Sequence, residues 1–250
     1  MSTARGGISG RFCIDSGCCG IRMSLKDRID EVEGRIAEAC RRSGRRRGEL
    51  RLVAVSKKFP LEVISEAAGL GLRDFGENYA QELRDKQREA GSGIATLRWH
   101  FIGALQRNKV KYVIGKADLV HAVDNIALVA ELDKRAAVRG IRVRALVEIN
   151  GGEKSKNGIR GSGLREFLES ASGFRNVSLE GLMMMPPYFE DPEMSRPWFS
   201  ELREMRDRVA GEFPGIQELS MGMSNDFEVA IEEGATILRI GTALFGPRPG

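Results

Sequence analysis

Eight short apolar runs that alternate with helical segments constrain the fold of this 250-residue chain more than any other feature. The runs lie at residues 50–57, 74–79, 98–103, 119–123, 143–150, 177–185, 218–221 and 237–241. Apolar side chains at both odd and even positions are typical of strands buried on both faces, as in parallel sheets. Helical spacing predicts helices at 24–43, 60–68, 81–90, 108–115, 126–139, 164–172, 198–213 and 227–233. The alternation predicts an α/β fold, a single (β/α)8 TIM barrel with an extra N-terminal helix.

An open, doubly wound sheet is the main alternative to the barrel. That fold usually has a glycine-rich turn after its first strand, whereas this chain reads Ser56-Lys57-Lys58-Phe59 there. Residues 1–22 lack the apolar core of a secretory signal, so we expect a disordered leader. We assign residues 24–247 to one barrel domain. No apolar run approaches the roughly 20 residues that span a bilayer, and we expect a cytoplasmic protein.

Charge and cysteine content exclude some classes of function. The formal charge is only +4, and the main basic cluster, at residues 41–47, has no interleaved aromatic residues. We interpret this cluster as a solvated turn rather than as a nucleic-acid site. The four cysteines and two histidines do not have the spacing of a structural zinc site. We therefore expect no metal site, and we assign no role to His100 or His121.

The first apolar run, residues 50–57, ends in Lys57. On a strand, Lys57 shares a face with Val53 and Val55 and lies at the carboxyl end of the buried run. Loss of hydration lowers the pKa of an ammonium, and the neutral amine can then attack a carbonyl. This pattern favours a Schiff-base lysine. A surface lysine that merely ends a strand is the alternative for this residue taken alone.

Polar residues follow the last two strands. Ser224 begins a helix after the seventh strand, and Gly241 and Thr242 follow the eighth. Barrels commonly bind phosphate in these two loops. The alternative is that Ser224 only caps a helix and Gly241 only makes a turn.

Arg239 lies in the middle of the eighth apolar strand and needs an acceptor if it is buried. An interior Glu148 could be that acceptor. An inward Arg239 would instead offer a donor to a ring nitrogen or an anion, beside the amine of Lys57 and the two phosphate loops. This combination of groups describes pyridoxal 5'-phosphate (PLP).

Several linked motifs, in order along residues 24–247, resemble the YggS/PROSC family of pyridoxal phosphate homeostasis proteins. They are Ala54-Val55-Ser56-Lys57, Phe75-Gly76-Glu77-Asn78-Tyr79, His100-Phe101-Ile102-Gly103, Gly181-Leu182-Met183, Leu219-Ser220-Met221-Gly222-Met223-Ser224 and Arg239-Ile240-Gly241-Thr242. The resemblance implies a barrel similar to the N-terminal domain of alanine racemase.

The resemblance also implies roles for individual residues. Lys57 would hold PLP as an internal aldimine, and Arg239 would face the pyridine nitrogen. The phosphate would be held by Ser224, Gly241 and Thr242, with Asn78 and Met223 lining the site. The family's loop after the fifth strand matches Ser155-Lys156-Asn157-Gly158, but the role of Lys156 stays open.

An arginine opposite the pyridine nitrogen keeps that nitrogen unprotonated, which makes the ring a poorer electron sink. Alanine racemase compensates with a catalytic tyrosine from a further domain, which we do not expect here. We therefore expect a non-catalytic PLP-binding protein of intracellular vitamin B6 homeostasis. A PLP-dependent racemase with a one-domain site and a Schiff-base aldolase are the alternatives. We expect a monomer whose ligand is PLP, with PLP-dependent apoenzymes as candidate recipients and no nucleic-acid or membrane partner.

Overall fold

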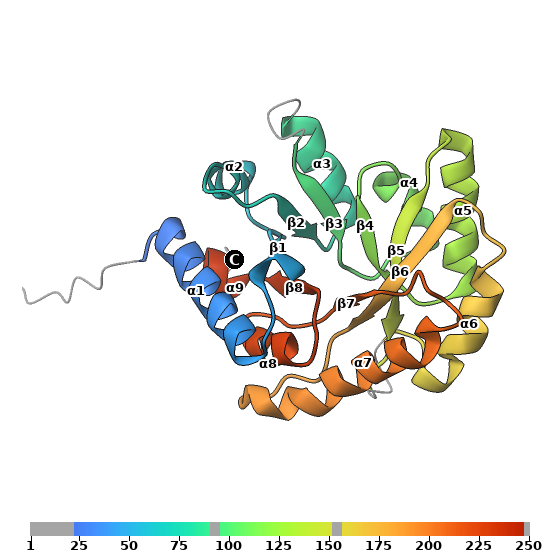
Figure 1. Ribbon diagram of the computed structural model, residues 1–250. Coiled ribbons are helices and arrows are strands. Elements are labelled where there is room, and N and C mark those ends of the chain that lie inside the picture. The colour runs from blue at the N-terminus through green and yellow to red at the C-terminus, as the bar shows by residue number, and fades with distance from the viewer. Residues whose placement is uncertain (1–22, 91–95, 152–156, 248–250) are drawn as a thin grey trace, which may run out of the picture.

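The computed structural model describes residues 23–90, 96–151 and 157–247. Within these residues, eight parallel strands pair in sequence order, and the last pairs with the first, so the sheet closes into a barrel (Figure 1). The strands are β1 (Arg51–Val55), β2 (Asp74–Glu77), β3 (Arg98–Phe101), β4 (Leu119–Val123), β5 (Val143–Ile149), β6 (Val177–Met184), β7 (Glu218–Ser220) and β8 (Ile237–Ile240). The predicted TIM barrel is confirmed.

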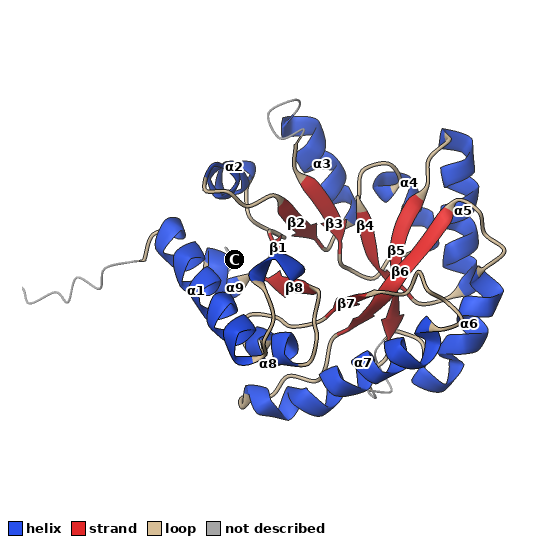
Figure 2. Cartoon of the chain, viewed as in Figure 1, coloured by secondary structure: helices blue, strands red, loops and turns tan. Residues whose placement is uncertain are grey.

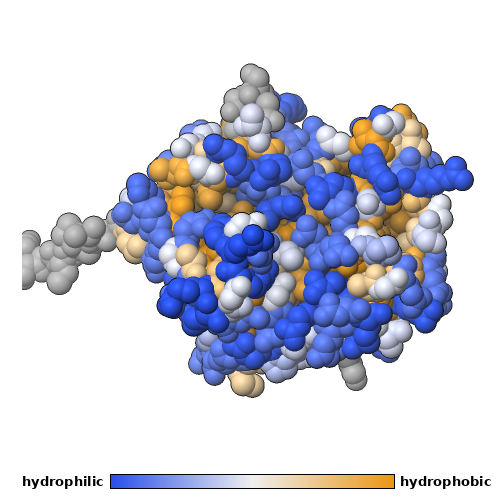
Figure 3. All heavy atoms as spheres, viewed as in Figure 1, coloured by the Kyte–Doolittle hydropathy of each residue, from blue (hydrophilic) through white to orange (hydrophobic). Residues whose placement is uncertain are grey.

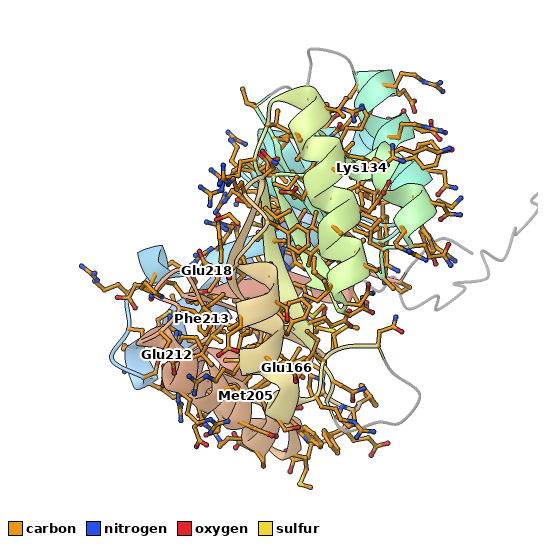
Figure 4. The ribbon with its side chains drawn as sticks, turned by 90° about the vertical axis from the view of Figure 1, so that its right-hand side faces the viewer. Lys134, Glu166, Met205, Glu212, Phe213 and Glu218 are labelled. Carbon is orange, nitrogen blue, oxygen red and sulfur yellow. The ribbon has the colours of Figure 1, made fainter. Side chains whose placement is uncertain are left out.

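Helices surround the strands on the outside of the barrel (Figure 2). They are α1 (Leu25–Arg42), α2 (Leu61–Gly69), α3 (Ala80–Ala90), α4 (Val110–Val113), α5 (Ile126–Arg139), α6 (Leu164–Ala171), α7 (Arg196–Ala210), α8 (Phe227–Glu232) and α9 (Thr242–Phe245). Short 3-10 turns lie at Arg47–Glu49, Arg107–Lys109, Gly161–Gly163 and Pro192–Ser195. Figure 4 shows the outer side of the barrel, with Lys134 on α5, Glu166 on α6 and Met205 on α7.

The predicted elements differ from the observed ones mainly at their ends. The first strand ends at Val55, so Lys57 lies in the following turn and not on the strand itself. The helix predicted at 108–115 is a 3-10 turn followed by the single turn α4. Helix α9 was not predicted, because four residues are too few to show helical periodicity. The predicted leader, residues 1–22, lies outside the described residues.

Helix α1 is the predicted extra N-terminal helix. The Ser24 hydroxyl accepts a hydrogen bond from the Asp27 N–H, and the Asp27 carboxylate accepts one from the Ser24 N–H, which together form a capping box. Its buried face packs against α8 and α9, which lie next to it in Figure 1. Arg28 Nε also donates to the Leu244 carbonyl at 2.6 Å. Helix α1 thus contacts the last two helices that the structure describes.

The hydrophobic core has two parts, as expected for a barrel. One small cluster consists of Val53, Leu119, Ala122, Leu146, Met183 and Ile237. These residues come from β1, β4, β5, β6 and β8, so they fill the space that the strands enclose. A much larger cluster lies between the strands and the helices. Residues on β1 illustrate the alternation, because Val53 belongs to the inner cluster and its neighbours Leu52 and Ala54 belong to the outer one.

The face of the molecule in Figure 3 shows hydrophilic residues around smaller hydrophobic areas. The basic cluster at 41–47 is paired with acidic side chains: Arg41 with Glu38, Arg46 with Glu49, and Arg47 with Glu33. This pairing agrees with its interpretation as a solvated turn. Among the helices of the described ranges, none combines the length and the hydropathy that crossing a bilayer requires.

Candidate functional site

Lys57 and Arg239 lie on neighbouring parts of the barrel. Strand β8 pairs with β1, and Arg239 is the register partner of Val53, four residues before Lys57. Because all strands are parallel, their carboxyl ends form one rim, and Lys57 lies at that rim in a half-buried position. Of the two residues predicted to bracket the cofactor, Arg239 thus lies on β8 and Lys57 lies in the turn that follows the adjacent strand β1.

Arg239 is 4% exposed and points into the barrel. Its Nη1 donates to Ser220 Oγ at 2.6 Å, and its Nη2 donates to the Met184 carbonyl at 3.0 Å. Burial lowers the pKa of Arg239 to about 10, so the guanidinium remains charged at neutral pH. Glu148, the alternative acceptor, makes no hydrogen bond through Oε2 within the described residues. The hydrogen-bond acceptors of Arg239 are therefore a hydroxyl and a backbone carbonyl.

Arg239 stands at one end of a buried hydrogen-bond chain across the barrel interior. Ser220 Oγ lies 2.9 Å from His121 Nδ1, and His121 Nε2 lies 2.9 Å from His100 Nδ1. The other ring nitrogen of His100, Nε2, lies 3.0 Å from Asp74 Oδ1. Burial lowers the pKa of both histidines, so both rings are neutral. The chain thus runs from a guanidinium to a carboxylate.

The two ends of this chain fix the direction of every hydrogen bond in it. Arginine only donates, so the Ser220 hydroxyl accepts from Arg239 and donates its own proton to His121. His121 then donates from Nε2 to His100, and His100 donates from Nε2 to Asp74. The Arg98 and His100 hydrogen bonds hold the pKa of Asp74 well below its usual range against the opposing effect of burial, so it stays an acceptor. Both imidazoles are therefore assigned as Nε2–H tautomers.

The sequence alone did not predict this series of hydrogen bonds. His100 and His121 were given no role, and here they are hydrogen-bonded core residues. A usable signal existed, since each histidine lies inside an apolar strand, where an isolated polar side chain needs a partner. The sequence did not show which polar groups on other strands would meet them.

The loops after β7 and β8 meet at the same rim. The backbone N–H of Ala243, in α9, donates to Ser224 Oγ at 3.2 Å. Ser224 does not cap the next helix, whose N-cap position is occupied by Asp226. Gly241 lies against β1, where an added Cβ would be 3.3 Å from the Cβ of Val55. The structure therefore brings together Ser224 and the Gly241–Thr242 segment, as the phosphate-loop prediction requires.

Gly222 gives the β7 loop its shape. Its φ is +89°, and an added Cβ would lie 2.7 Å from the Ala230 Cβ, so only glycine fits. The next residue, Met223, is half-buried, and its N–H donates to Asp226 Oδ1 at 2.7 Å. Thr242 is exposed as the first residue of α9. Lys156 lies outside the described residues.

Asn78 lines a cavity of about 290 Å³ at the carboxyl ends of β2, β3 and β5. Gly103 makes room for it, because a Cβ there would lie 2.3 Å from the Asn78 carbonyl oxygen and 2.9 Å from its Oδ1. Glu148 also lines the cavity, is 9% exposed, and has a buried Oε2 without a hydrogen bond. Burial, and secondarily the charge of Asp124, raises the pKa of Glu148 to about 7.

Comparison with known proteins identifies the family. The alanine racemase N-terminal domain family matches residues 32–249. A protein of Aquifex aeolicus named pyridoxal phosphate homeostasis protein is 48% identical over 228 residues, covering 90% of this chain and 99% of that one. The protein of the same name from Escherichia coli is 39% identical over 225 residues, covering 88% of this chain and 95% of that one.

Solved structures of similar proteins support the same family and the same fold. The structure of PipY from Synechococcus elongatus with PLP bound has a TM-score of 0.78 and 32% sequence identity, and the match covers 89% of this chain and all of PipY (100%). An alanine racemase from Clostridium difficile shares the fold, with a TM-score of 0.64 at 14% identity, over 88% of this chain and 57% of the racemase. The chain therefore belongs to the family of pyridoxal phosphate homeostasis proteins, which is built on the alanine racemase N-terminal domain.

Proposed function

We propose that this protein binds PLP for intracellular vitamin B6 homeostasis, with the cofactor held as a Schiff base on Lys57. The main support is one observation: the rim of a closed barrel places Lys57 beside the strand that holds a buried, charged Arg239. The names of the relatives and the PLP bound to PipY are consistent with this function.

The residues at the rim fit the chemical groups of PLP. The Lys57 amine would condense with the aldehyde to form a C=N bond, with loss of one water molecule. Ser224, Gly241 and Thr242 would hold the phosphate, since a hydroxyl and a close backbone approach suit an anion there. Arg239 would face the ring nitrogen, with Asn78 and Met223 lining the remaining sides.

Homeostasis without amino-acid turnover is the finer part of the proposal. The guanidinium of Arg239 only donates hydrogen bonds, so it would pair with an unprotonated ring nitrogen. An unprotonated ring withdraws electrons weakly, so a carbanion next to the ring would gain little stabilisation. PLP would then be stored by a monomeric, cytoplasmic protein and passed to PLP-dependent apoenzymes. The fold shared with alanine racemase favours the second candidate, a PLP-dependent racemase. Conversion of D- or L-alanine by the purified protein would support the racemase and contradict the storage function.

Borohydride reduction tests the Schiff base directly. We expect purified protein with PLP to show a visible absorption band that borohydride removes, and mass spectrometry to find the pyridoxyl group on Lys57. The Lys57→Ala variant should lack the band. Lys134→Ala is a control, because Lys134 is an exposed lysine on α5 and its removal should leave the adduct in place. An adduct on another residue, or no band at all, would contradict the proposal.

A further inference from the structure

The turn after β1 has an unusual backbone conformation. Lys58 has a φ of +67°, and within the described ranges it is the one residue other than glycine with a positive φ. The Phe59 N–H donates to the Ser56 carbonyl at 3.0 Å, which closes a tight turn with Lys57 and Lys58 at its centre. A positive φ at the third position of such a turn normally requires glycine or asparagine. Something must therefore hold Lys58 in this conformation.

Ser56, which precedes Lys57, is completely buried. Its backbone N–H, its hydroxyl and its carbonyl all form hydrogen bonds. Its N–H donates to the Gly76 carbonyl at 3.0 Å, and its hydroxyl donates to Glu77 Oε1 at 2.6 Å. Its carbonyl accepts from Lys86 Nζ at 2.9 Å, in addition to the bond from Phe59. The position of the chain entering the turn is thus fixed by β2 and α3.

Lys58, on the other side of Lys57, is held by the same group of charges. Its N–H donates to Glu82 Oε1 at 2.6 Å. Lys86 Nζ lies 2.8 Å from that oxygen and 2.7 Å from Glu77 Oε1. Lys86 is only 7% exposed, and its ammonium joins the groups that hold both neighbours of Lys57. We call Ser56, Glu77, Glu82 and Lys86 the Lys86 cluster.

We propose that the Lys86 cluster is a positioning device that holds Lys58 in the left-handed conformation and thereby directs the Lys57 amine toward its carbonyl ligand. This inference builds on the proposed function of Lys57. Without the acceptor on Glu82, Lys58 would relax to a negative φ, because a side chain is disfavoured at a positive one. The turn would then change shape and carry Lys57 away from the rest of the site. Glu82 and Lys86 act through the backbone, so they are positioning residues and not catalytic ones.

The test compares PLP binding by Glu82 and Lys58 variants, measured as the titration of the visible Schiff-base band. Glu82→Ala should weaken binding roughly five- to thirtyfold, the range set by the preference against a left-handed side chain. Adding Lys58→Gly to that variant should restore binding to within about twofold of the wild type, because glycine adopts this φ without penalty. Rescue of this kind separates positioning from a general loss of stability.

Two further variants keep the test independent of folding. Lys58→Val should weaken binding although the cluster is intact, because a β-branched residue is strongly disfavoured at a positive φ. Glu89→Ala is the matched control, since Glu89 is an exposed glutamate on the same helix, and it should bind PLP as the wild type does. Folded Glu82→Ala and Lys58→Val variants with wild-type affinity, or a failed rescue by Lys58→Gly, would overturn the inference. If the wild-type protein shows no visible band, the proposed function fails together with this inference. If the wild-type band forms and only the variants differ from expectation, this inference alone fails.

Discussion

At the scale of single residues, burial shifts the pKa values of the polar groups inside the barrel and at its rim. Arg239 stays charged because burial lowers its pKa only to about 10, and the negative charge of Asp226 opposes the effect of burial. His121 is fully buried and neutral, since desolvation is the largest cause of its lowered pKa. Glu148 and Glu77 differ, because within the described residues each has one carboxylate oxygen that is buried without a hydrogen bond. A buried carboxyl without a partner favours its protonated form.

Glu148 should therefore make stability depend on pH. Its pKa is raised from the ordinary value of 4.5 to about 7, so between these values the folded state holds a proton that the unfolded state has lost. The contribution of Glu148 is fully present below pH 4.5 and is lost as pH rises through 7. Between pH 5 and 8, wild-type protein should lose roughly 2–3 kcal/mol of unfolding free energy relative to Glu148→Gln.

Urea unfolding at several pH values measures this difference. The exposed Glu201 on α7 gives a matched control, and Glu201→Gln should follow the wild-type pH profile. Parallel profiles for the wild type and Glu148→Gln would show that Glu148 ionises normally. Glu77, whose pKa burial also raises to about 7, is present in all three proteins and cancels in the comparison.

At the scale of elements, the rim depends on how closely neighbouring strands approach. Strands β2 and β3 pair in register from Asp74 with Arg98 to Glu77 with Phe101. Just beyond this pairing, Gly103 lies so close to Asn78 that the two chains leave no space for a Cβ. This contact shapes the cavity that Asn78, Gly103 and Glu148 line. The same edge is where Asn78 is proposed to contact the cofactor.

Replacing Gly103 tests the importance of this contact. In Gly103→Ala, the new Cβ would lie 2.3 Å from the Asn78 carbonyl oxygen, so backbone must shift. We expect a loss of roughly 1–3 kcal/mol of unfolding free energy, together with weaker PLP binding. Thermal unfolding and titration of the visible band would measure both. Gly173→Ala is the control, because no atom lies within 4 Å of its added Cβ, and a normal Gly103→Ala protein would show that the rim adapts easily.

At the scale of the whole molecule, helix α1 connects the first and last parts of the barrel. Arg35 pairs with Glu228 at 2.6 Å, and Arg28 donates to the Leu244 carbonyl, so α1 is held to both α8 and α9. Ile36, in the buried face of α1, has no exposed surface (0%). Gly241 is the N-cap residue of α9, and Thr242 is the first residue of that helix. Because α1 is held to α9, a shift of α1 would also move the proposed phosphate loop.

Truncating the buried face of α1 should therefore weaken the whole domain. Ile36→Ala should lower the unfolding free energy by about 2–4 kcal/mol, because it removes buried methyl groups and leaves a cavity. Glu31→Ala, at an exposed position of the same helix, should change it by less than about 0.5 kcal/mol. Urea unfolding measures both values. Equal stability of the two variants would mean that α1 is not part of the cooperative unit.

Much of the fold was predictable because local sequence encodes it. The periodicity of residues 126–139 gave α5 with its correct ends, and the apolar run 119–123 gave β4. Lys57 and Arg239 were identifiable because a charged side chain beside or within a buried strand is unusual. The shortest elements were the hardest, since a one-turn helix such as α4 contains too few residues for a periodic pattern.

The sequence by itself determined most of the strands and longer helices, and it predicted Lys57 after the first strand, Ser224 after the seventh and Arg239 within the eighth. Only the tertiary structure decided which of these groups meet. His121 bonds to Ser220, 99 residues away, and Lys58 adopts a positive φ because Glu82 on α3 accepts its N–H. Strand alternation fixes the face on which a side chain lies, but its partner across the barrel is set by closure of the sheet, which joins distant parts of the chain.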